Sequence, residues 1–258
     1  MGSRRIKAEI RNFSGATASR IISGLAEDRP HHHEWPVLSI HLLGEMTKFS
    51  DDGEVVISSP SAIFHAPGAS HANIVGERGC EQIDIVFDPA WLRLESSSPL
   101  NGVPCWIGGT TALAARALAR LWSSRNASEE ELRRSTKSFL RLAATATPPR
   151  QPQWLPNIIE KIRRHPNLTA AELAPIAGCR PEWLTQAFRA ATGEGLAELS
   201  MRLRVERAAF RLRTTEWRAA DVALEAGFCD QSHMNRCFRQ VLERTPLQVR
   251  AESAQLTG

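Results

Sequence analysis

The sequence predicts a two-domain α+β fold. An N-terminal β-barrel with a pair of helices (residues 1–146, helical from about 110) precedes a linker at 147–153. An all-α domain at 154–252 follows, in which a long helix joins two helix-turn-helix motifs. Short apolar runs separated by turn residues fill the first hundred positions, prolines crowd the linker, and one helical pattern occurs at 172–178 and again at 221–227. Such runs are typical of small barrels, and dense prolines cannot continue a helix.

The composition is that of a globular protein. The 258 residues are enough for two ordinary domains, with 42% hydrophobic and 23% charged residues. No apolar run is long enough to span a bilayer, and the N-terminus lacks the apolar core of a signal peptide. We therefore expect a cytoplasmic protein with no membrane partner. The five cysteines are odd in number and lack metal-ligand spacing, so we expect reduced, mostly buried thiols.

The positive charge lies in the C-terminal part. Residues 1–149 contain 16 Lys and Arg against 16 Asp and Glu, and residues 150–258 contain 16 against 12, so the net +4 belongs to the second domain. This bias favours a phosphate backbone as partner. Ordinary solvated arginines would give the same count, so charge alone does not decide.

Four runs predict strands in the N-terminal domain. They are apolar or alternate in polarity, and turns such as 51–53 separate them. The runs are 37–43, 54–57, 62–65 and 82–87. Which strand faces turn inward does not follow from the sequence, so Trp35, His41 and Phe64 are provisional choices for pocket residues.

Two amphipathic helices should follow the strands. The first, 110–122, places Leu113, Ala117, Leu118 and Leu121 on one face. The second begins at the capping box Ser128-x-x-Glu131 and carries Leu132, Phe139, Leu140 and Ala143 at helical spacing. Both helices need an apolar partner surface.

The repeated pattern predicts two helix-turn-helix motifs. Each copy has an acidic residue, an apolar residue and Ala on a short helix, then Gly178 or Gly227 in the turn, and then a second helix. The second helices keep an apolar face, formed by Trp183, Leu184 and Phe188 in the first copy and by Met234, Cys237 and Phe238 in the second. The residues expected to face outward are Glu182, Thr185, Gln186 and Arg189 in the first copy, and Gln231, Ser232, Asn235, Arg236 and Arg239 in the second.

Residues 169–250 resemble the DNA-binding domain of the AraC/XylS family of bacterial transcription regulators. The most specific part is Ala226-Gly227-Phe228-Cys229-Asp230-Gln231-Ser232-His233-Met234-Asn235-Arg236-Cys237-Phe238-Arg239, followed by Thr245-Pro246-Leu247-Gln248-Val249-Arg250. The resemblance implies that the second helix of each copy reads base edges in the major groove, where Gln, Asn and Arg make bidentate contacts. In this family the helices at 110–146 often form an antiparallel dimer contact, and packing on the barrel is the equal alternative.

The connecting helix, about 195–213, sets the distance between the copies. Its roughly 18 residues span about 27 Å, so both second helices can reach successive grooves of one DNA face, about 34 Å apart, with some bending. Met201, Leu203, Val205, Ala208, Ala209 and Leu212 should pack against the two copies, and Arg202, Arg204, Arg207 and Arg211 should point outward. Trp183, Phe188, Trp217, Phe228 and Phe238 are expected in the core.

Three residues depart from the family pattern. Pro175 lies late in a short helix, where it removes one backbone hydrogen bond and predicts a kink. Arg180 and Arg218 replace the Ser or Thr that usually caps a helix, although Pro181 is a good first helical residue. Thr169 and Glu172 form a second capping box.

The N-terminal histidines raise the question of a metal. The segments 31–34 and 66–73 resemble cupin motifs, in which histidines and a glutamate hold a divalent metal. His31, His33, Glu34 and His71 could take those roles, with His65 as a spare. Adjacent residues on a strand point to opposite faces, so His33 and Glu34 could not share one site. The favoured interpretation is a polar turn with hydrogen-bonded histidines and no cofactor.

The resemblance implies a sequence-specific DNA-binding transcriptional regulator that is not an enzyme. A small-molecule effector of the N-terminal domain would control it by shifting a population of conformers. Double-stranded DNA is the expected partner, with a homodimer and RNA polymerase contact as further expectations. The alternatives are a metal-binding cupin enzyme or metal sensor with an attached DNA module, and a DNA-binding protein whose barrel has no ligand. The effector, the operator and the direction of regulation do not follow from the sequence.

Overall fold

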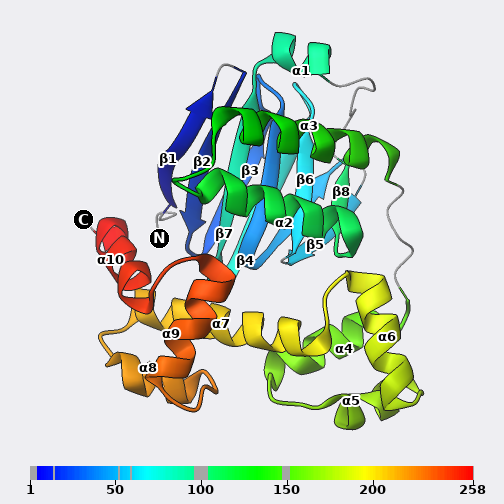
Figure 1. The fold of residues 1–258 in the computed structure, drawn as a ribbon, viewed down its shortest axis with the longest axis vertical. Coiled ribbons are helices and arrows are strands. Elements are labelled where there is room, and N and C mark those ends of the chain that lie inside the picture. The colour runs from blue at the N-terminus through cyan, green and yellow to red at the C-terminus, as the bar shows by residue number, and fades with distance from the viewer. Residues whose placement is uncertain are drawn as a thin grey trace. The chain divides into compact units, whose positions relative to one another are not determined.

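The chain divides into two compact units, Met1–Pro148 and Pro149–Gly258. The computed structural model describes residues 5–13, 15–51, 53–58, 60–95, 104–146 and 152–257. Most of the predicted linker, residues 147–151, lies outside the described residues. Figure 1 labels the strands of the first unit and the helices of the second.

The described residues of the first unit form one antiparallel sheet of eight strands. All four predicted runs lie in strands, within β4 to β7, while the three strands before them and the last one were not predicted individually. The strands are β1 (Arg5–Phe13), β2 (Ala16–Ser23), β3 (Ala26–His31), β4 (Val37–Ser50), β5 (Gly53–Ser58), β6 (Ser61–His65), β7 (His71–Phe87) and β8 (Cys105–Ile107).

The predicted barrel is wrong in one respect, because the sheet is not closed. Among the described residues the paired path runs β1-β2-β7-β4-β6-β8, with β3 on β7 and β5 on β4, and its end strands do not pair with each other. The long strands β4 and β7 each take part in two layers. In the first layer, the first half of β4 pairs with β6 and the second half of β7 pairs with β2. In the second layer, the second half of β4 pairs with β5 and the first half of β7 pairs with β3.

Gly44 lies where β4 passes from one layer to the other. The register of β4 against β7 shifts on both sides of this residue, and its φ is 80°. A Cβ atom here would lie 2.1 Å from the carbonyl oxygen of Gly79. Only glycine permits both this backbone conformation and this close approach, so the bend of the sheet depends on it.

The layer that contains β6 and β2 has two faces of different chemistry. Leu38, Ile40, Ala62 and Phe64 point to one face and form a core with the helices α2 (Gly109–Ser123) and α3 (Glu129–Thr145). Figure 1 shows these helices side by side across that face. Because side chains alternate along a strand, Ser39, His41, Ser61 and His65 point to the opposite face, toward the second layer. Ile63 also points to that face, and it packs with Met46, Ile57 and Val75 of the second layer. We call the face that carries Ser39, His41, Ser61, Ile63 and His65 the inner face.

Of the two alternatives for the helical pair, packing on the sheet is present within the chain, and a dimer contact stays a prediction. The capping box at Ser128 is confirmed, and Leu132, Phe139, Leu140 and Ala143 are all buried. The face predicted for α2 is only partly right. Ala117 is exposed and Leu113 half-buried, whereas Ala115, Ala119 and Trp122 are buried. A short helix α1 (Pro89–Glu95) follows the last residues of β7.

The second unit is helical throughout. Its elements are α4 (Leu155–Arg164), α5 (Ala170–Ala177), α6 (Pro181–Thr192), α7 (Leu196–Thr214), α8 (Ala219–Glu225), α9 (Gln231–Leu242) and α10 (Pro246–Thr257). The predicted connecting helix is α7, with 19 residues. One core forms where α4, α5 and α6 pack against Leu196, Leu199 and Leu203 of α7. The second half of α7 packs against α8, α9 and α10.

The helix with the internal proline is less disturbed than predicted. α5 runs without interruption from Ala170 to Ala177, and its capping box at Thr169 is confirmed. Pro175 is exposed and lies in the last turn. There the missing backbone donor costs one hydrogen bond and leaves the helix end intact.

Candidate functional site

The turns of the two helix-turn-helix units have the same geometry. Gly178 has a φ of 64°, and the following amide, of Cys179, donates to the carbonyl of Ala174 at 3.1 Å. Gly227 has a φ of 88°, and Phe228 donates to Ala223 at 2.9 Å. This hydrogen bond closes a helix end when glycine enters the left-handed region. The repeated sequence pattern therefore reflects a repeated backbone structure.

The predicted outward residues of α6 are exposed. Leu184 and Phe188 are buried beneath the helix, while Glu182, Thr185, Gln186 and Arg189 are exposed. The Arg189 guanidinium lies 3.6 Å from the carboxylate of Glu198 in α7. The Thr185 hydroxyl donates to the carbonyl of Pro181 at 2.9 Å. Two of the four candidates are therefore engaged within the chain.

The corresponding face of α9 carries more unneutralised charge. Gln231, Ser232, Arg236 and Arg239 are exposed, and Asn235 is half-buried. The helix begins at Asp230, whose carboxylate accepts the amide of His233 at 2.7 Å. Within the described part of the chain neither arginine of this face forms an ion pair. This face can therefore donate to a phosphate or a base edge without first breaking an internal contact.

Two tryptophans were wrongly assigned to the core. Trp183 on α6 is 50% exposed and Trp217 before α8 is 46% exposed. Trp183 contacts the ring of Trp154 edge to face at 5.9 Å, and Arg211 lies over the Trp217 ring at 5.5 Å. The other three aromatic assignments, Phe188, Phe228 and Phe238, are confirmed as buried.

The arginines of α7 were also wrongly predicted to point outward. They bind groups of neighbouring helices and turns instead. Arg204 donates to the carbonyl of Gly227 at 3.3 Å, Arg207 donates to the carbonyl of Arg163 at 3.3 Å, and Arg211 pairs with Glu225 at 3.0 Å. These contacts attach α4 and the second helix-turn-helix unit to the connecting helix.

Arg202 is the extreme case, with a side chain only 2% exposed. Its guanidinium donates to Glu194 at 2.5 and 3.4 Å and to Glu206 at 3.1 Å. Burial alone would lower the pKa of Arg202, but the two carboxylates raise it above its ordinary value. Glu194 lies in the turn between α6 and α7, so this buried ion cluster fixes that turn.

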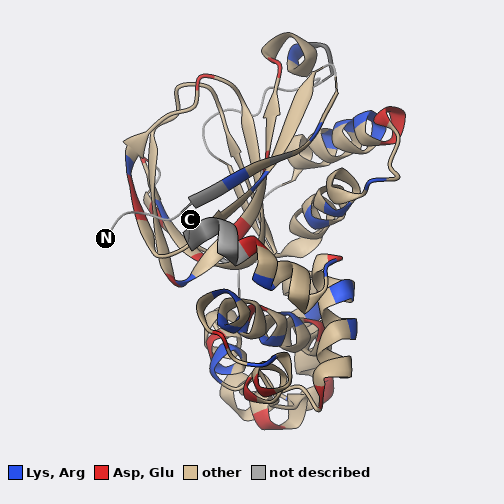
Figure 2. Ribbon diagram, turned by 90° about the vertical axis from the view of Figure 1, so that its left-hand side faces the viewer, with Lys and Arg blue, Asp and Glu red and all other residues tan. Residues whose placement is uncertain are grey.

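Charge does not by itself outline a DNA-binding face. Figure 2 shows basic and acidic residues interspersed over the helices of the second unit. Exposed arginines with acidic neighbours account for part of this pattern, for example Arg164 with Glu160 and Arg218 with Asp221. The helix-turn-helix geometry is therefore the more specific signal.

Comparison with known proteins identifies the family. A helix-turn-helix domain model matches residues 173–252. Regulatory protein SoxS of Salmonella typhimurium is 33% identical over 100 residues, which are 38% of this chain and 94% of SoxS. SoxS of Escherichia coli K12 is 33% identical over 78 residues, which are 30% of this chain and 73% of that SoxS sequence. The chain belongs to the AraC/XylS family. It is a DNA-binding transcriptional regulator.

Two solved structures match at lower sequence identity. The match to ToxT from Vibrio cholerae covers 94% of this chain and 98% of the ToxT chain, with 14% identity and a TM-score of 0.39. The match to the C-terminal domain of the response regulator YesN from Fusobacterium nucleatum covers 37% of this chain and 93% of that domain. Its identity is 26% and its TM-score is 0.34. In the described residues of this AraC/XylS protein, no helix is both long and apolar enough to cross a membrane.

The inner face of the N-terminal unit is a second candidate site. Its buried polar atoms include several without a hydrogen-bond partner, namely His41 Nε2, Ser61 Oγ, His65 Nδ1 and Asn73 Oδ1. His41 pairs with Ser61 in one layer, and Asn73 pairs with the buried Lys48 in the other. Lys48 connects the two pairs, because its charge contributes to lowering the pKa of both His41 and His65. Buried polar groups are normally hydrogen-bonded, so such a cluster indicates a place for water or a polar ligand.

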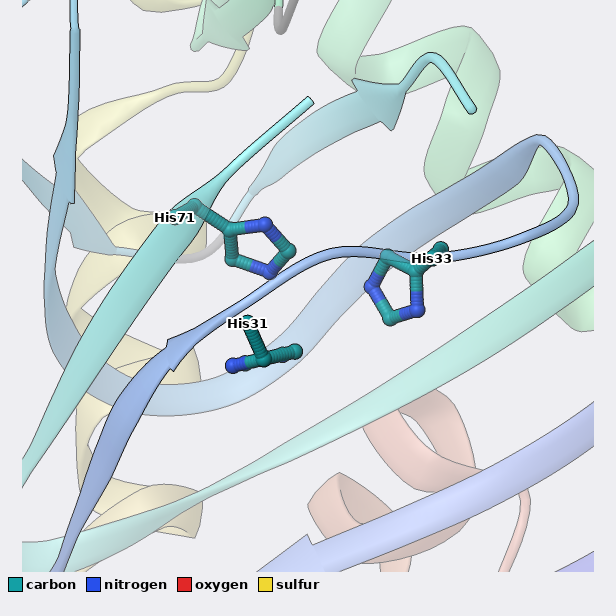
Figure 3. A group of neighbouring side chains, drawn as sticks. All are labelled: His31, His33 and His71. Carbon is teal, nitrogen blue, oxygen red and sulfur yellow. The ribbon is translucent and has the colours of Figure 1, made fainter. Parts of the chain in front are cut away.

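Four histidines gather at one end of this face. His31 ends β3, His33 follows it, His65 ends β6 and His71 begins β7. The ring centroids of His31 and His65 lie 4.3 Å from that of His71. Figure 3 shows His31, His33 and His71 around one space. Burial, with the neighbouring His31, lowers the pKa of His71 to about 4, and burial also lowers the pKa of His65. Both rings are therefore neutral at pH 7.

The structure brings together only some of the N-terminal candidates. The histidine group that could hold a metal is His31, His33 and His71, and Glu34 is exposed outside it. Of the pocket choices, His41 points to the inner face, Trp35 is exposed, and Phe64 packs under the helices. Sequence reasoning missed Lys48, Ser61 and Asn73, since only the strand register places them beside His41 and His65.

Proposed function

We propose that this regulator binds DNA with α6 and α9 in successive major grooves on one face of the duplex, separated by α7. The 19 residues of α7 make a rod about 28 Å long at about 1.5 Å per residue. The groove repeat is about 34 Å, so modest bending of the duplex would complete the fit. The supporting observation is a pair of helix-turn-helix turns with the same hydrogen bond and similar φ, one on each side of the continuous helix α7.

We assign base reading to the exposed side chains at the N-terminal and middle turns of α6 and α9. They are Glu182, Thr185, Gln186 and Arg189, and Gln231, Ser232, Asn235, Arg236 and Arg239. Arginine suits guanine, glutamine and asparagine suit adenine, and a glutamate accepts from cytosine. Because α9 carries two unpaired arginines and α6 carries one paired with Glu198, α9 should contribute more to affinity.

DNA selected from a random pool by the full chain should give a footprint of two protected segments about one helical turn apart. Inserting 5 base pairs between the segments should reduce affinity to that of a single segment, since it turns them to opposite faces of the duplex. Replacing the intervening base pairs without changing the spacing is the matched control, and it should have little effect. One protected segment, or tolerance of the insertion, would contradict the arrangement.

We propose that a polar small molecule bound at the inner face controls DNA binding. The support is the group of buried, unpartnered atoms on His41, Ser61, His65 and Asn73. A ligand that satisfies them would stabilise one conformer and shift the population that binds DNA. Dimerisation through α2 and α3, and contact with RNA polymerase, remain predictions from the family.

An effector of this kind should raise the melting temperature of the full chain by a few degrees and change its operator affinity. Both effects should disappear in His41→Leu, which removes a polar atom of the inner face and keeps its apolar volume. Trp35→Leu is the control, because Trp35 is exposed and should not contact the ligand. A ligand that acts equally on parent and His41→Leu would contradict binding at the inner face.

A further inference from the structure

We propose that His31, His33 and His71 bind one divalent first-row transition-metal ion. The site lies in the N-terminal unit, where the segment after β3 passes the first residue of β7 (Figure 3). It goes beyond DNA binding and does not depend on it. A bound ion would connect two segments that are forty residues apart in the sequence.

The spacing of the three rings suits a shared ion. One candidate ligand atom from each ring lies within 4.8 Å of the others. Imidazole nitrogens bind zinc at about 2.0–2.1 Å, so two ligands of one tetrahedral ion are about 3.4 Å apart. The difference is up to about 1.4 Å. Rotation of the His33 ring, which lies in the irregular segment between β3 and β4, can supply it.

Backbone carbonyls already orient two of the rings for metal binding. His31 Nδ1 lies 2.9 Å from the carbonyl oxygen of Arg29, and His71 Nδ1 lies 3.5 Å from that of Ala69. A carbonyl oxygen can only accept, so each Nδ1 carries the proton and each Nε2 keeps a free lone pair. Metal-binding histidines commonly use their second nitrogen in this way.

The surroundings favour an ion that prefers nitrogen. In the described residues the group consists of imidazoles alone, which suit zinc, nickel, cobalt, copper or iron better than magnesium or calcium. His65, 3% exposed, lies behind the group with its ring centroid 4.3 Å from that of His71, and its Nδ1 has no partner. It is a candidate fourth ligand. The buried Lys48 opposes a cation, so it limits the affinity.

The three consecutive histidines at 31–33 suggest a competing explanation, simple chelation at the surface. His32 is exposed and outside the group, whereas His71 is buried and comes from another strand. The two sites therefore differ in which histidine they need. His32→Ala and His71→Ala form a matched pair that separates them.

The test titrates cobalt(II) and then zinc(II) into the full chain, purified without a histidine tag and treated with a chelator. Visible absorption of cobalt(II) reports the coordination, and calorimetry reports the stoichiometry. We expect one ion per chain, with tetrahedral or five-coordinate cobalt bands. His71→Ala should weaken binding at least about 100-fold, since loss of a ligand exceeds the 10–100-fold effect of losing a partner of a ligand. His32→Ala should bind like the parent.

Thermal unfolding and circular dichroism without metal show whether each variant keeps its fold. If His71→Ala fails to fold, His33→Ala replaces it, because His33 is half-buried and outside regular structure. Binding that survives His71→Ala or His33→Ala but is lost in His32→Ala would assign the ion to the surface run and overturn the proposal. Absence of stoichiometric binding in the parent would overturn it as well. Operator binding, measured on the same samples, reports the proposed DNA-binding function separately.

Discussion

Arg202→Ala is expected to destabilise the C-terminal unit by about 3–5 kcal/mol, the usual cost of removing one partner from a buried ion pair. The substitution removes the guanidinium that pairs with Glu194, a residue only 4% exposed. Glu206 also loses a hydrogen bond. Because the chain has two units, hydrogen exchange resolved by peptide is the suitable measurement, and it should show faster exchange across α6 and α7.

An exposed ion pair of the same unit provides the control for this variant. Arg218 pairs with Asp221 at 3.0 Å, but its side chain is 84% exposed. Arg218→Ala should therefore change stability by no more than about 1 kcal/mol. If Arg202→Ala cost less than about 1 kcal/mol, the cluster would not be what holds the turn between α6 and α7. The position of the first recognition helix relative to α7 would then need another explanation.

The C-terminal unit could be predicted closely because its determinants are local. Gly178 and Gly227, the capping box at Thr169 and the apolar spacing along α6 and α9 each act within a few residues. Such signals specify helix ends and buried faces without knowledge of the rest of the fold. The same reasoning placed nine outward residues, and eight of them are exposed, with Asn235 half-buried.

Long-range contacts explain where sequence reasoning failed in this unit. The spacing of Arg202, Arg204, Arg207 and Arg211 suggested an outward charged face, but a helix packed on two sides has little free surface. Partners for these arginines come from α4, from the end of α8 and from two turns. Trp183 was wrongly assigned because helical spacing alone does not say how wide the buried face of α6 is. Trp217 lies in the loop between α7 and α8, where helical spacing does not apply.

The N-terminal unit was predicted less well because its structure depends on strand register. The sequence identified four strands, but the first three strands are short of apolar residues or carry charge, as β3 does with Glu27, Asp28 and Arg29. Nothing local indicates that β4 and β7 bend between two layers. The approach of His31 and His33 to His71 follows from pairing between β3 and β7, which is a non-local fact.

Arg236→Ala is expected to reduce affinity for the specific operator by about 1–3 kcal/mol, roughly 5- to 150-fold, if Arg236 makes a bidentate base contact. The residue is exposed on the outer face of α9, and its removal breaks no hydrogen bond or ion pair among the described residues. Affinity for unrelated DNA should change much less, because loss of a base contact affects one sequence position. Electrophoretic mobility shifts at a fixed salt concentration, with the selected operator and a scrambled duplex, measure both.

A control must show whether the loss of affinity in Arg236→Ala comes from a lost base contact or only from a lost positive charge. Arg141→Ala removes the same charge from α3 in the N-terminal unit, where the side chain is also exposed. It should alter affinity for both duplexes only slightly. If Arg236→Ala instead weakened both duplexes equally and lowered the salt dependence by about one unit, Arg236 would contact a phosphate. An operator affinity within about 1 kcal/mol of the parent would remove α9 Arg236 from base reading altogether.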